Sequence, residues 1–299
     1  METATRSYEW MVKSTPQQEW IEKRGIMLWL AFFFLELGAG TFIVAAIFNS
    51  LLGMFVGWLI CAIGGGGFHM LYLGHPLRFW RILLSGRFTT SWISRGLTFT
   101  LVFLILGAIY MILAQWASPS FGLLIAAGIF ALFSVAYAGF ALNFVNGIPL
   151  WNTPLLPALY IILGIWGGLG INLIIMLATG ATSAVHNIEQ WSQIFLITFI
   201  VIVFLYLFGI RYQTSFSSTS TGKISVKNIL AGKWSPLFWI MVVALGMALP
   251  LGVAIGSWAS GWAIPGVFLS VVIAFEILGD LSLRYCILRN GLYTPLIPL

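Results

Sequence analysis

Three ionisable residues near the end of the chain are spaced so that they could hold or pass protons. Glu276, Asp280 and Arg284 follow one another at intervals of four residues in the apolar stretch FEILGDLSLR. On a helix this spacing places all three side chains on one face. Ionisable groups inside a membrane helix are costly and usually have a function. The pattern indicates an inward polar ladder, either a neutralised packing pair or part of a proton route.

Glu36 and Tyr137 lie inside apolar runs in the first half of the chain. Glu36 stands in FFFLELGAGTF, where Gly38 and Gly40 would let another helix or a ligand approach closely. Tyr137 stands in SVAYAGFALNFVN. A tyrosine in such a run is either an interface anchor or part of a buried polar pocket. The two asparagines that follow it favour the pocket.

Two histidines and a tyrosine follow a run of four glycines. His69, Tyr72 and His75 come after Gly64–Gly67, a run that indicates either a close helix crossing or a break in the helix. A histidine near neutral pH can shuttle a proton or donate a hydrogen bond to a carbonyl group. Haem would need two histidines at similar depth on facing helices, and His186 lies near the opposite membrane surface. No haem is therefore expected in this chain.

The composition shows which solvent these residues meet. The 299 residues are 60% hydrophobic and 7% charged, with a mean hydropathy of +1.01. A soluble globule of this length could not bury so much apolar surface. The net charge of +6 follows from basic residues that flank apolar runs, so nucleic-acid binding is not expected. The two cysteines form no CxxC motif, which argues against a metal or iron–sulfur cluster.

The apolar runs predict an all-α integral membrane protein. Long continuous runs are typical of helices rather than of barrel strands. Two four-helix bundles are expected, over 26–146 and 147–289, between a polar N-terminal segment (1–25) and a C-terminal tail (290–299). The segment 214–235 is interpreted as a polar loop, and 76–90 as a basic, aromatic segment along the membrane interface. The eight spans are predicted at 26–49, 51–73, 91–115, 121–143, 155–180, 190–210, 236–258 and 262–285.

The basic residues predict the orientation of these spans. All 14 Lys and Arg residues fall on the face, here called the basic side, that holds both termini and the connections 74–90, 144–154 and 211–235. The positive-inside rule predicts that this side is cytoplasmic and that the protein lies in the inner membrane. Some of these charges could also dock a soluble partner; the candidates are Arg78, Arg81, Arg87 and Arg95.

Ionisable side chains inside the spans and tryptophans near the span ends are expected at different depths in the membrane. The ionisable groups inside the spans all lie between the midplane and the basic side; Glu36, for example, is about 16 Å into the first span. A ligand is therefore expected to enter from lipid and to meet protons near the basic side. Trp151 and the other tryptophans near span ends are interpreted as belt residues at the interface.

Several motifs resemble a known family of membrane subunits. YAG (Tyr137–Gly139) followed by IPLWNTPLLP (Ile148–Pro157) resembles the membrane subunit of polysulfide reductase and its relatives, the NrfD-like family. The segments LGHPLRFW (Leu73–Trp80) and SWISR (Ser91–Arg95) resemble the same family and also the anchor subunit of anaerobic dimethyl sulfoxide reductase. ELGAGTF (Glu36–Phe42) looks like the family's glycine-rich first helix.

This resemblance implies a quinone-interacting subunit that has no redox cofactor of its own. Such a subunit anchors an iron–sulfur partner, which contacts a catalytic subunit that often carries molybdopterin. The bound quinone would be menaquinone or ubiquinone, held within the first four helices. The family's pocket tyrosine maps onto Tyr137, its polar first-helix position onto Glu36, and the arginine of its Leu-Gly-x-Pro-x-Arg motif onto Arg78.

The chain departs from the dimethyl sulfoxide reductase anchor at two positions. The quinol-site histidine of that anchor corresponds to Tyr72 here, with His69 and His75 on either side. Its acidic residue after the Ser-x-x-Ser segment corresponds to Gly96. The resulting hypothesis is that Tyr137 and His69 or His75 bind the quinone, that Glu36 exchanges protons with it, and that Glu276 and Asp280 supply a second proton route. The alternatives are a secondary transporter with buried acids and a passive anchor.

Overall fold

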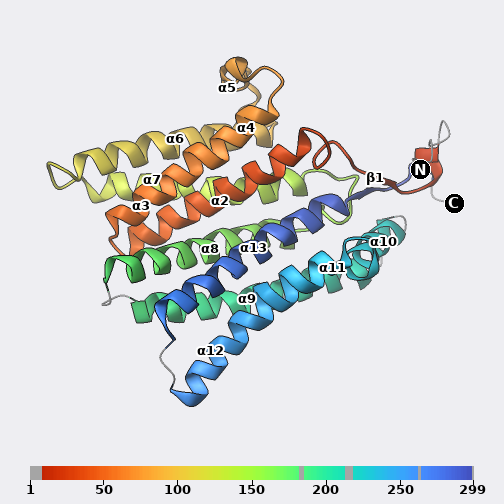
Figure 1. The fold of residues 1–299 in the computed structure, drawn as a ribbon. Helices are drawn as coiled ribbons and strands as arrows, with labels where there is room; N and C mark the ends of the chain where they lie inside the picture. Colours follow the sequence, from red (N-terminus) through yellow and green to blue (C-terminus); the bar gives the residue numbers. More distant parts are fainter. Residues whose placement is uncertain (1–8, 182–184, 213–217, 262–263, 298–299) are drawn as a thin grey trace.

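The computed structural model describes residues 9–181, 185–212, 218–261 and 264–297, and the described chain is almost entirely helical (Figure 1). Eight of its helical stretches are long and apolar enough to cross a membrane, which confirms the predicted all-α class. The protein is therefore a multi-pass membrane protein. The spans are α2 (Gly25–Ile47), α3–η1–α4 (Leu51–Tyr72), α6 (Trp92–Leu113), α7 (Phe121–Asn143), α8 (Leu155–Thr179), α9 (Val185–Tyr212), α11–η5–α12 (Ser235–Ser260) and α13 (Gly266–Arg289).

Most span boundaries agree with the sequence prediction to within a few residues. Serine side chains cap three of the helices, at Ser50, Ser91 and Ser120. Two spans deviate more: α9 begins at Val185 rather than at 190, and α13 runs from Gly266 to Arg289 rather than over 262–285. The buried Arg284 lies inside this helix and does not mark its end.

Within the spans, two segments form wider π-helical turns. They are η1 (Ile60–Gly66), between α3 (Leu51–Leu59) and α4 (Gly67–Tyr72), and η5 (Phe238–Ala248), between α11 (Ser235–Leu237) and α12 (Leu249–Ser260). The glycine run Gly64–Gly67 is therefore part of a continuous span. It is also a close crossing, because a Cβ atom on Gly65 would lie 2.8 Å from the Cα atom of Leu35.

The connection between the sixth and seventh spans differs from the prediction. Its polarity predicts a loop over 214–235, but α10 (Ser218–Ala231) occupies most of this segment; residues 213–217 lie outside the described part. Thr221, Ser225, Val226 and Ile229 are buried, so they form one inward face of an amphipathic helix. The loop prediction is wrong because it depends on polarity alone and ignores this spacing.

The two ends of the chain meet on one side of the molecule (Figure 1). After the short α1 (Glu9–Val12), strand β1 (Thr15–Pro16) pairs antiparallel with β2 (Leu292–Tyr293). The Gln17 side chain donates a hydrogen bond of 2.5 Å to the carbonyl oxygen of Leu288. Within the described residues the two terminal segments are thus paired with each other. Arg6, one of the 14 basic residues assigned to the basic side, lies outside the described residues.

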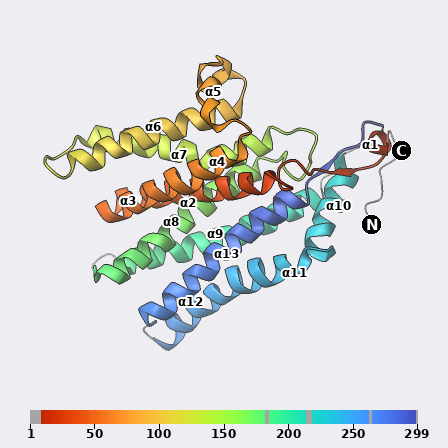
Figure 2. The same cartoon turned by 45° about the horizontal axis from the view of Figure 1, so that its top comes forward.

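A short helical excursion joins the second and third spans. It consists of η2 (Pro76–Arg78), α5 (Trp80–Leu84) and η3 (Arg87–Thr89), and it projects away from the bundle (Figure 2). Most of its side chains are exposed.

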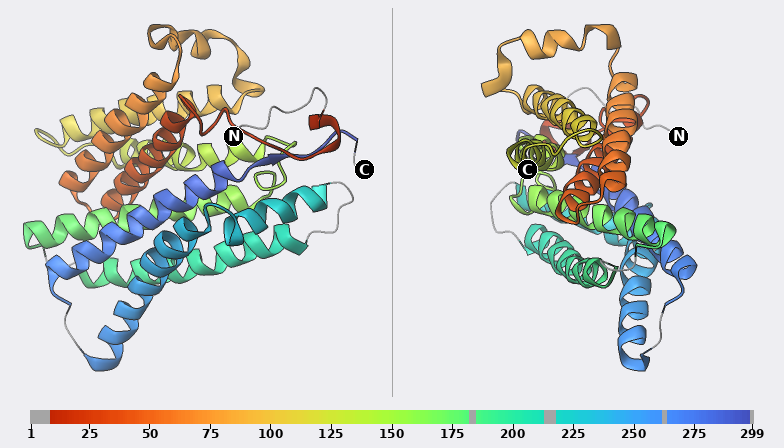
Figure 3. Two further views of the ribbon diagram at one scale, coloured as in Figure 1. Left: turned by 45° about the vertical axis from the view of Figure 1, so that its right-hand side comes forward. Right: turned by 90° about the vertical axis from the view of Figure 1, so that its left-hand side faces the viewer.

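Helix α2 lies in the interior of the molecule, against α3, α7 and α8 (Figure 3). As the sequence predicted, Gly38 and Gly40 allow close packing. A Cβ atom on Gly38 would lie 2.3 Å from the backbone nitrogen of Cys61, and one on Gly40 would lie 1.9 Å from the carbonyl oxygen of Gly164 in α8. Small residues are what bring helices together in lipid, where no hydrophobic force does so. Helix α2 belongs to the predicted first bundle and α8 to the predicted second, yet the two helices are in close contact. The division into two bundles therefore stays a prediction.

Contrary to the sequence prediction, Trp151 does not lie in the tryptophan belt at the membrane interface. It is fully buried, and its indole N–H donates a 2.9 Å hydrogen bond to the carbonyl oxygen of Ile287. Its ring lies 5.4 Å from that of Trp20. Trp151 therefore ties the connection after α7 to the end of α13 and to the N-terminal segment, which no single-span pattern indicates.

Candidate functional site

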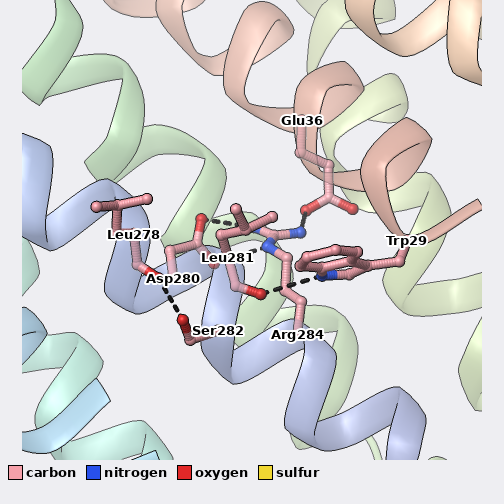
Figure 4. A network of polar contacts seen from close by, with 7 residues as sticks. All are labelled: Trp29, Glu36, Leu278, Asp280, Leu281, Ser282 and Arg284. Atoms are coloured by element: carbon pink, nitrogen blue, oxygen red, sulfur yellow. Dashed lines mark hydrogen bonds and ion pairs between the residues drawn. The ribbon is translucent and has the colours of Figure 1, made fainter. Parts of the chain in front are cut away.

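The first and last spans share a buried ion cluster (Figure 4). The Arg284 guanidinium donates from Nε to Oδ1 of Asp280 at 2.6 Å and from Nη2 to Oδ2 at 3.2 Å. Its Nη1 atom donates to Oε2 of Glu36. The three residues are at most 3% exposed. Arg284 is thus a core residue, as the inward ladder predicted, and it joins α13 to α2 through Glu36, a partner that the sequence did not indicate.

Aromatic groups surround the cation of this cluster. The Arg284 guanidinium lies 4.6 Å from the ring centre of Tyr160 and 6.0 Å from that of Phe33. Nearby, the Trp29 indole N–H donates 3.0 Å to the carbonyl oxygen of Leu281 (Figure 4). With both carboxyl groups ionised the cluster carries a formal charge of −1, and Oε1 of Glu36 has no hydrogen-bond partner among the described residues.

Glu276 lies one helical turn from Asp280. Together with Trp166, Gly167 and Gly170 of α8, the two residues line a narrow gap that has no room for a water-sized molecule. The predicted ladder is thus confirmed in its geometry, since Glu276, Asp280 and Arg284 all face inward. Arg284 of this ladder also pairs with Glu36, so the carboxyl groups of the first and last spans belong to one polar region.

His69 and Tyr137 come together at the basic-side ends of α4 and α7. Their ring centres are 6.2 Å apart, and the Phe32 ring lies 5.7 Å from each of them. Tyr137 is buried, as predicted for a pocket residue. Tyr72, at the end of α4, is partly buried and packs against the core cluster that includes Tyr137. His75 is exposed in the following connection.

The hydrogen bonding of His69 determines its tautomer. Its Nδ1 atom lies 2.8 Å from the carbonyl oxygen of Gly65. Because a carbonyl oxygen can only accept, Nδ1 carries the hydrogen. In the neutral imidazole, Nε2 is then a free acceptor, and it is shielded and has no partner among the described residues. A ligand hydroxyl group could donate to this atom, and a charged His69 could donate to a ligand carbonyl.

Gly96 makes room for Tyr137. A Cβ atom on Gly96 would lie 2.1 Å from Cδ2 of the Tyr137 ring. The Tyr137 ring therefore fills the space that a side chain at position 96 would need.

Gly96→Asp is expected to destabilise the protein by about 3 kcal/mol or more, because it overpacks the ring and buries an unpaired acid. Gly96→Ala should keep the overpacking alone and cost about 1–3 kcal/mol. Thermal unfolding in detergent measures both. A double variant, Gly96→Ala with Tyr137→Leu, should regain part of the loss; an unchanged melting temperature in Gly96→Ala would contradict the contact.

The four arginines proposed for docking differ in their surroundings. Arg78, Arg81 and Arg87 are exposed. Arg95 is half-buried: its Nε donates 2.8 Å to the carbonyl oxygen of Phe88, and its guanidinium lies 4.7 Å from the Trp92 ring centre. Arg95 thus holds the turn before α6 in place.

Sequence reasoning missed three polar residues of α8. The Tyr160 hydroxyl, the Trp166 indole N–H and the Asn172 Oδ1 atom are buried and lack hydrogen-bond partners among the described residues. Asn172 donates 3.0 Å to the carbonyl oxygen of Thr41 in α2. The signal that could have found it is an asparagine inside an otherwise apolar span.

The fold and these clusters define a multi-pass helical membrane protein with a buried ion cluster and a histidine–tyrosine pair near one membrane face. The chain belongs to the polysulphide reductase NrfD family, whose model matches residues 23–296. The resemblance inferred from the sequence motifs is thereby confirmed. Within the described residues, no three His, Cys, Asp or Glu side chains gather as metal ligands would.

Individual relatives show the same similarity. The chain is 28% identical to the C subunit of polysulfide reductase from Wolinella succinogenes, over 77% of this chain and 78% of that protein. It is 26% identical to a protein NrfD homolog of Haemophilus influenzae and 27% identical to protein NrfD of Escherichia coli, in each case over 53% of this chain. The chain thus spans about half the length of these two NrfD proteins, 49% of each.

Proposed function

We propose that this chain is the quinone- or quinol-interacting membrane subunit of a respiratory oxidoreductase. Family membership supports a membrane subunit of this kind. The observation that carries the quinone assignment is the partnerless Nε2 atom of His69 beside the buried Tyr137. Two hydrogen-bonding groups of this kind suit the paired oxygens of a quinone head group.

His69 and Tyr137 fit such a head group by their donor and acceptor character. Quinone and quinol interconvert by the transfer of two electrons and two protons. His69 Nε2 receives a proton from a hydroxyl group, or returns one when the ring is charged. The Tyr137 hydroxyl can donate or accept. The Phe32 ring, 5.7 Å from both rings, would border a group that bonds to the two side chains.

The buried acids provide a proton route in this proposal. Glu36 lies one helical turn beyond Phe32 on α2, and Arg284 links it to Asp280. Glu276 extends the series by a further turn of α13. Glu36 exchanges protons with the quinone site, and Asp280 and Glu276 continue the route along α13.

The partners follow from the same proposal. An iron–sulfur subunit docks on the basic side, where Arg78 and Arg81 are exposed, and passes electrons between the quinone and a catalytic subunit that carries molybdopterin. Both termini lie in the cytoplasm and the protein spans the inner membrane. Either menaquinone or ubiquinone has the carbonyl oxygens that the site requires.

The test is quinol-linked turnover of the intact complex in membranes. His69→Gln should lower it about a hundredfold, because glutamine cannot take up a proton. Tyr137→Phe should lower it about tenfold through the loss of one hydrogen bond. Glu36→Gln keeps an acceptor for Arg284 but cannot carry a proton, so turnover should also fall sharply.

Two controls separate the quinone site from general damage. A soluble electron donor should still drive the catalytic subunit in all three variants, and the exposed His75→Gln should behave as the wild type does. Unchanged quinol activity in Tyr137→Phe and Glu36→Gln would remove both residues from the site.

A further inference from the structure

An apolar groove opens between α6 and α7 near their basic-side ends. It has a volume of about 390 Å³ and is open to the outside, and Phe88 and Thr89 of η3 contribute to its lining. The partly exposed rings of Phe88 and Phe133 line it, so it is accessible from outside the protein. The walls come from Trp92, Arg95 and Phe99 on α6 and from Phe133, Ala136 and Phe140 on α7.

The shape of this groove is set by packed aromatic rings. The wall residues recur at intervals of three and four on each helix, so they share one face of α6 and one face of α7. The Trp92 and Phe140 rings stack with centres 4.7 Å apart, and the Phe99 and Phe133 ring centres are 4.9 Å apart. These pairs hold the two helices at a fixed separation.

The groove changes character with depth. Arg95 lies about 5 Å along the helix axis from Trp92, the first residue of α6, and Phe99 lies about 10 Å from it. The cation is therefore near the membrane surface, and the deeper walls are hydrocarbon rings. This gradient matches an amphiphile whose polar end lies at Arg95 and whose apolar end lies against Phe99.

The cation at the mouth selects an anionic head group. The Nε and Nη2 atoms of Arg95 donate to the carbonyl oxygens of Phe88 and Thr89, and these acceptors are neutral. The positive charge has no acidic partner among the described ion pairs, and Nη1 makes none of the described hydrogen bonds. Arg87 is exposed and directly precedes the groove residue Phe88 in the chain, so its backbone position brings a second cation next to the groove. A guanidinium held in this way suits a phosphate group.

We propose that this groove binds one anionic phospholipid, with its phosphate at Arg95 and Arg87 and an acyl chain along Phe99 and Phe133. A quinone head group is uncharged and would leave the two cations unpaired. The site is separate from the His69–Tyr137 pair, so the proposal does not depend on the quinone assignment.

The test measures lipid retained by the full chain, purified with the subunits that accompany it. The protein is exposed to equal amounts of phosphatidylglycerol and phosphatidylcholine with the same acyl chains, and bound lipid is counted by native mass spectrometry. For each arginine that contacts the phosphate, phosphatidylglycerol should be retained in about fivefold excess over phosphatidylcholine. Arg87→Gln should remove about fivefold of this preference without touching the contacts of Arg95.

A matched pair of variants tests the groove itself. Ala136→Phe fills it and should abolish retention, whereas Ile129→Phe, on the same helix and already exposed, should retain lipid as the wild type does. Equal retention of the two lipids by the wild type would overturn the proposal. It would also fail if Ala136→Phe retained as much lipid as Ile129→Phe, or if the molecule lost from Ala136→Phe in native membranes were a quinone.

Discussion

Arg284→Met is expected to destabilise the protein by about 3–5 kcal/mol, because it leaves two buried carboxyl groups without their cation. Glu36 and Asp280 both bond to this one guanidinium, and all three side chains are buried. Methionine fills much of the volume of the arginine stem, so the loss reports the charge rather than a cavity. Thermal or denaturant unfolding in detergent measures the change.

Arg289→Met is the matched control on the same helix. Arg289 pairs with Glu22 at 2.5 Å, but the side chains of this pair are 29% and 37% exposed. Solvent screens such a pair, so its loss should cost at most about 1 kcal/mol. The triple variant Glu36→Leu, Asp280→Leu and Arg284→Met removes every charge of the cluster and should recover most of the stability. Equal losses in Arg284→Met and Arg289→Met would contradict this account.

The spans could be predicted from the sequence because they depend on local properties, whereas their orientation stays a prediction. A run of about 20 apolar residues must be helical in lipid, and basic residues mark one face. These rules fail where a residue is stabilised by a distant partner. The four-residue spacing indicates that Arg284 shares a face with Asp280, but no local pattern indicates its second partner Glu36, which is 248 residues away in the sequence.

The candidate site was predictable in its residue types but not in its bonding. His69 and Tyr137 could be singled out as polar groups near the basic side, and they do meet. The partnerless Nε2 of His69 depends on the carbonyl oxygen of Gly65, and the place of the Tyr137 ring depends on Gly96 in the facing helix. Such contacts follow from helix packing, which a single sequence does not specify.

The Trp151 and α10 errors have a common physical cause. A tryptophan near a span end and a polar connection are both typical of the membrane surface. Here the basic-side connections fold back onto the helix ends, so Trp151 is buried against α13 and α10 buries one face. In a connection that packs against the helix bundle, residues are buried by their spacing and contacts, as in the core of a soluble protein.

Gly40→Ala is expected to destabilise the protein by about 3 kcal/mol or more, since the added methyl group would meet backbone rather than a flexible side chain. Its Cβ atom would lie 1.9 Å from the carbonyl oxygen of Gly164, so α2 would have to move away from α8. Gly128→Ala, on α7, is the control, because a Cβ atom there has no neighbour within 4 Å. Unfolding of both variants in detergent measures the difference.

The same substitution connects helix packing to the ion cluster. Gly40 is one helical turn from Glu36, and Gly164 also packs against the backbone of Glu36. If α2 moves away from α8, Glu36 moves with it, while Arg284 and Asp280 stay on α13. Gly40→Ala should therefore make a further Arg284→Met substitution less costly than it is in the wild type, as a double-mutant cycle would show. Strictly additive losses would mean that α2 can shift without disturbing the cluster, and that its charges are positioned by α13 alone.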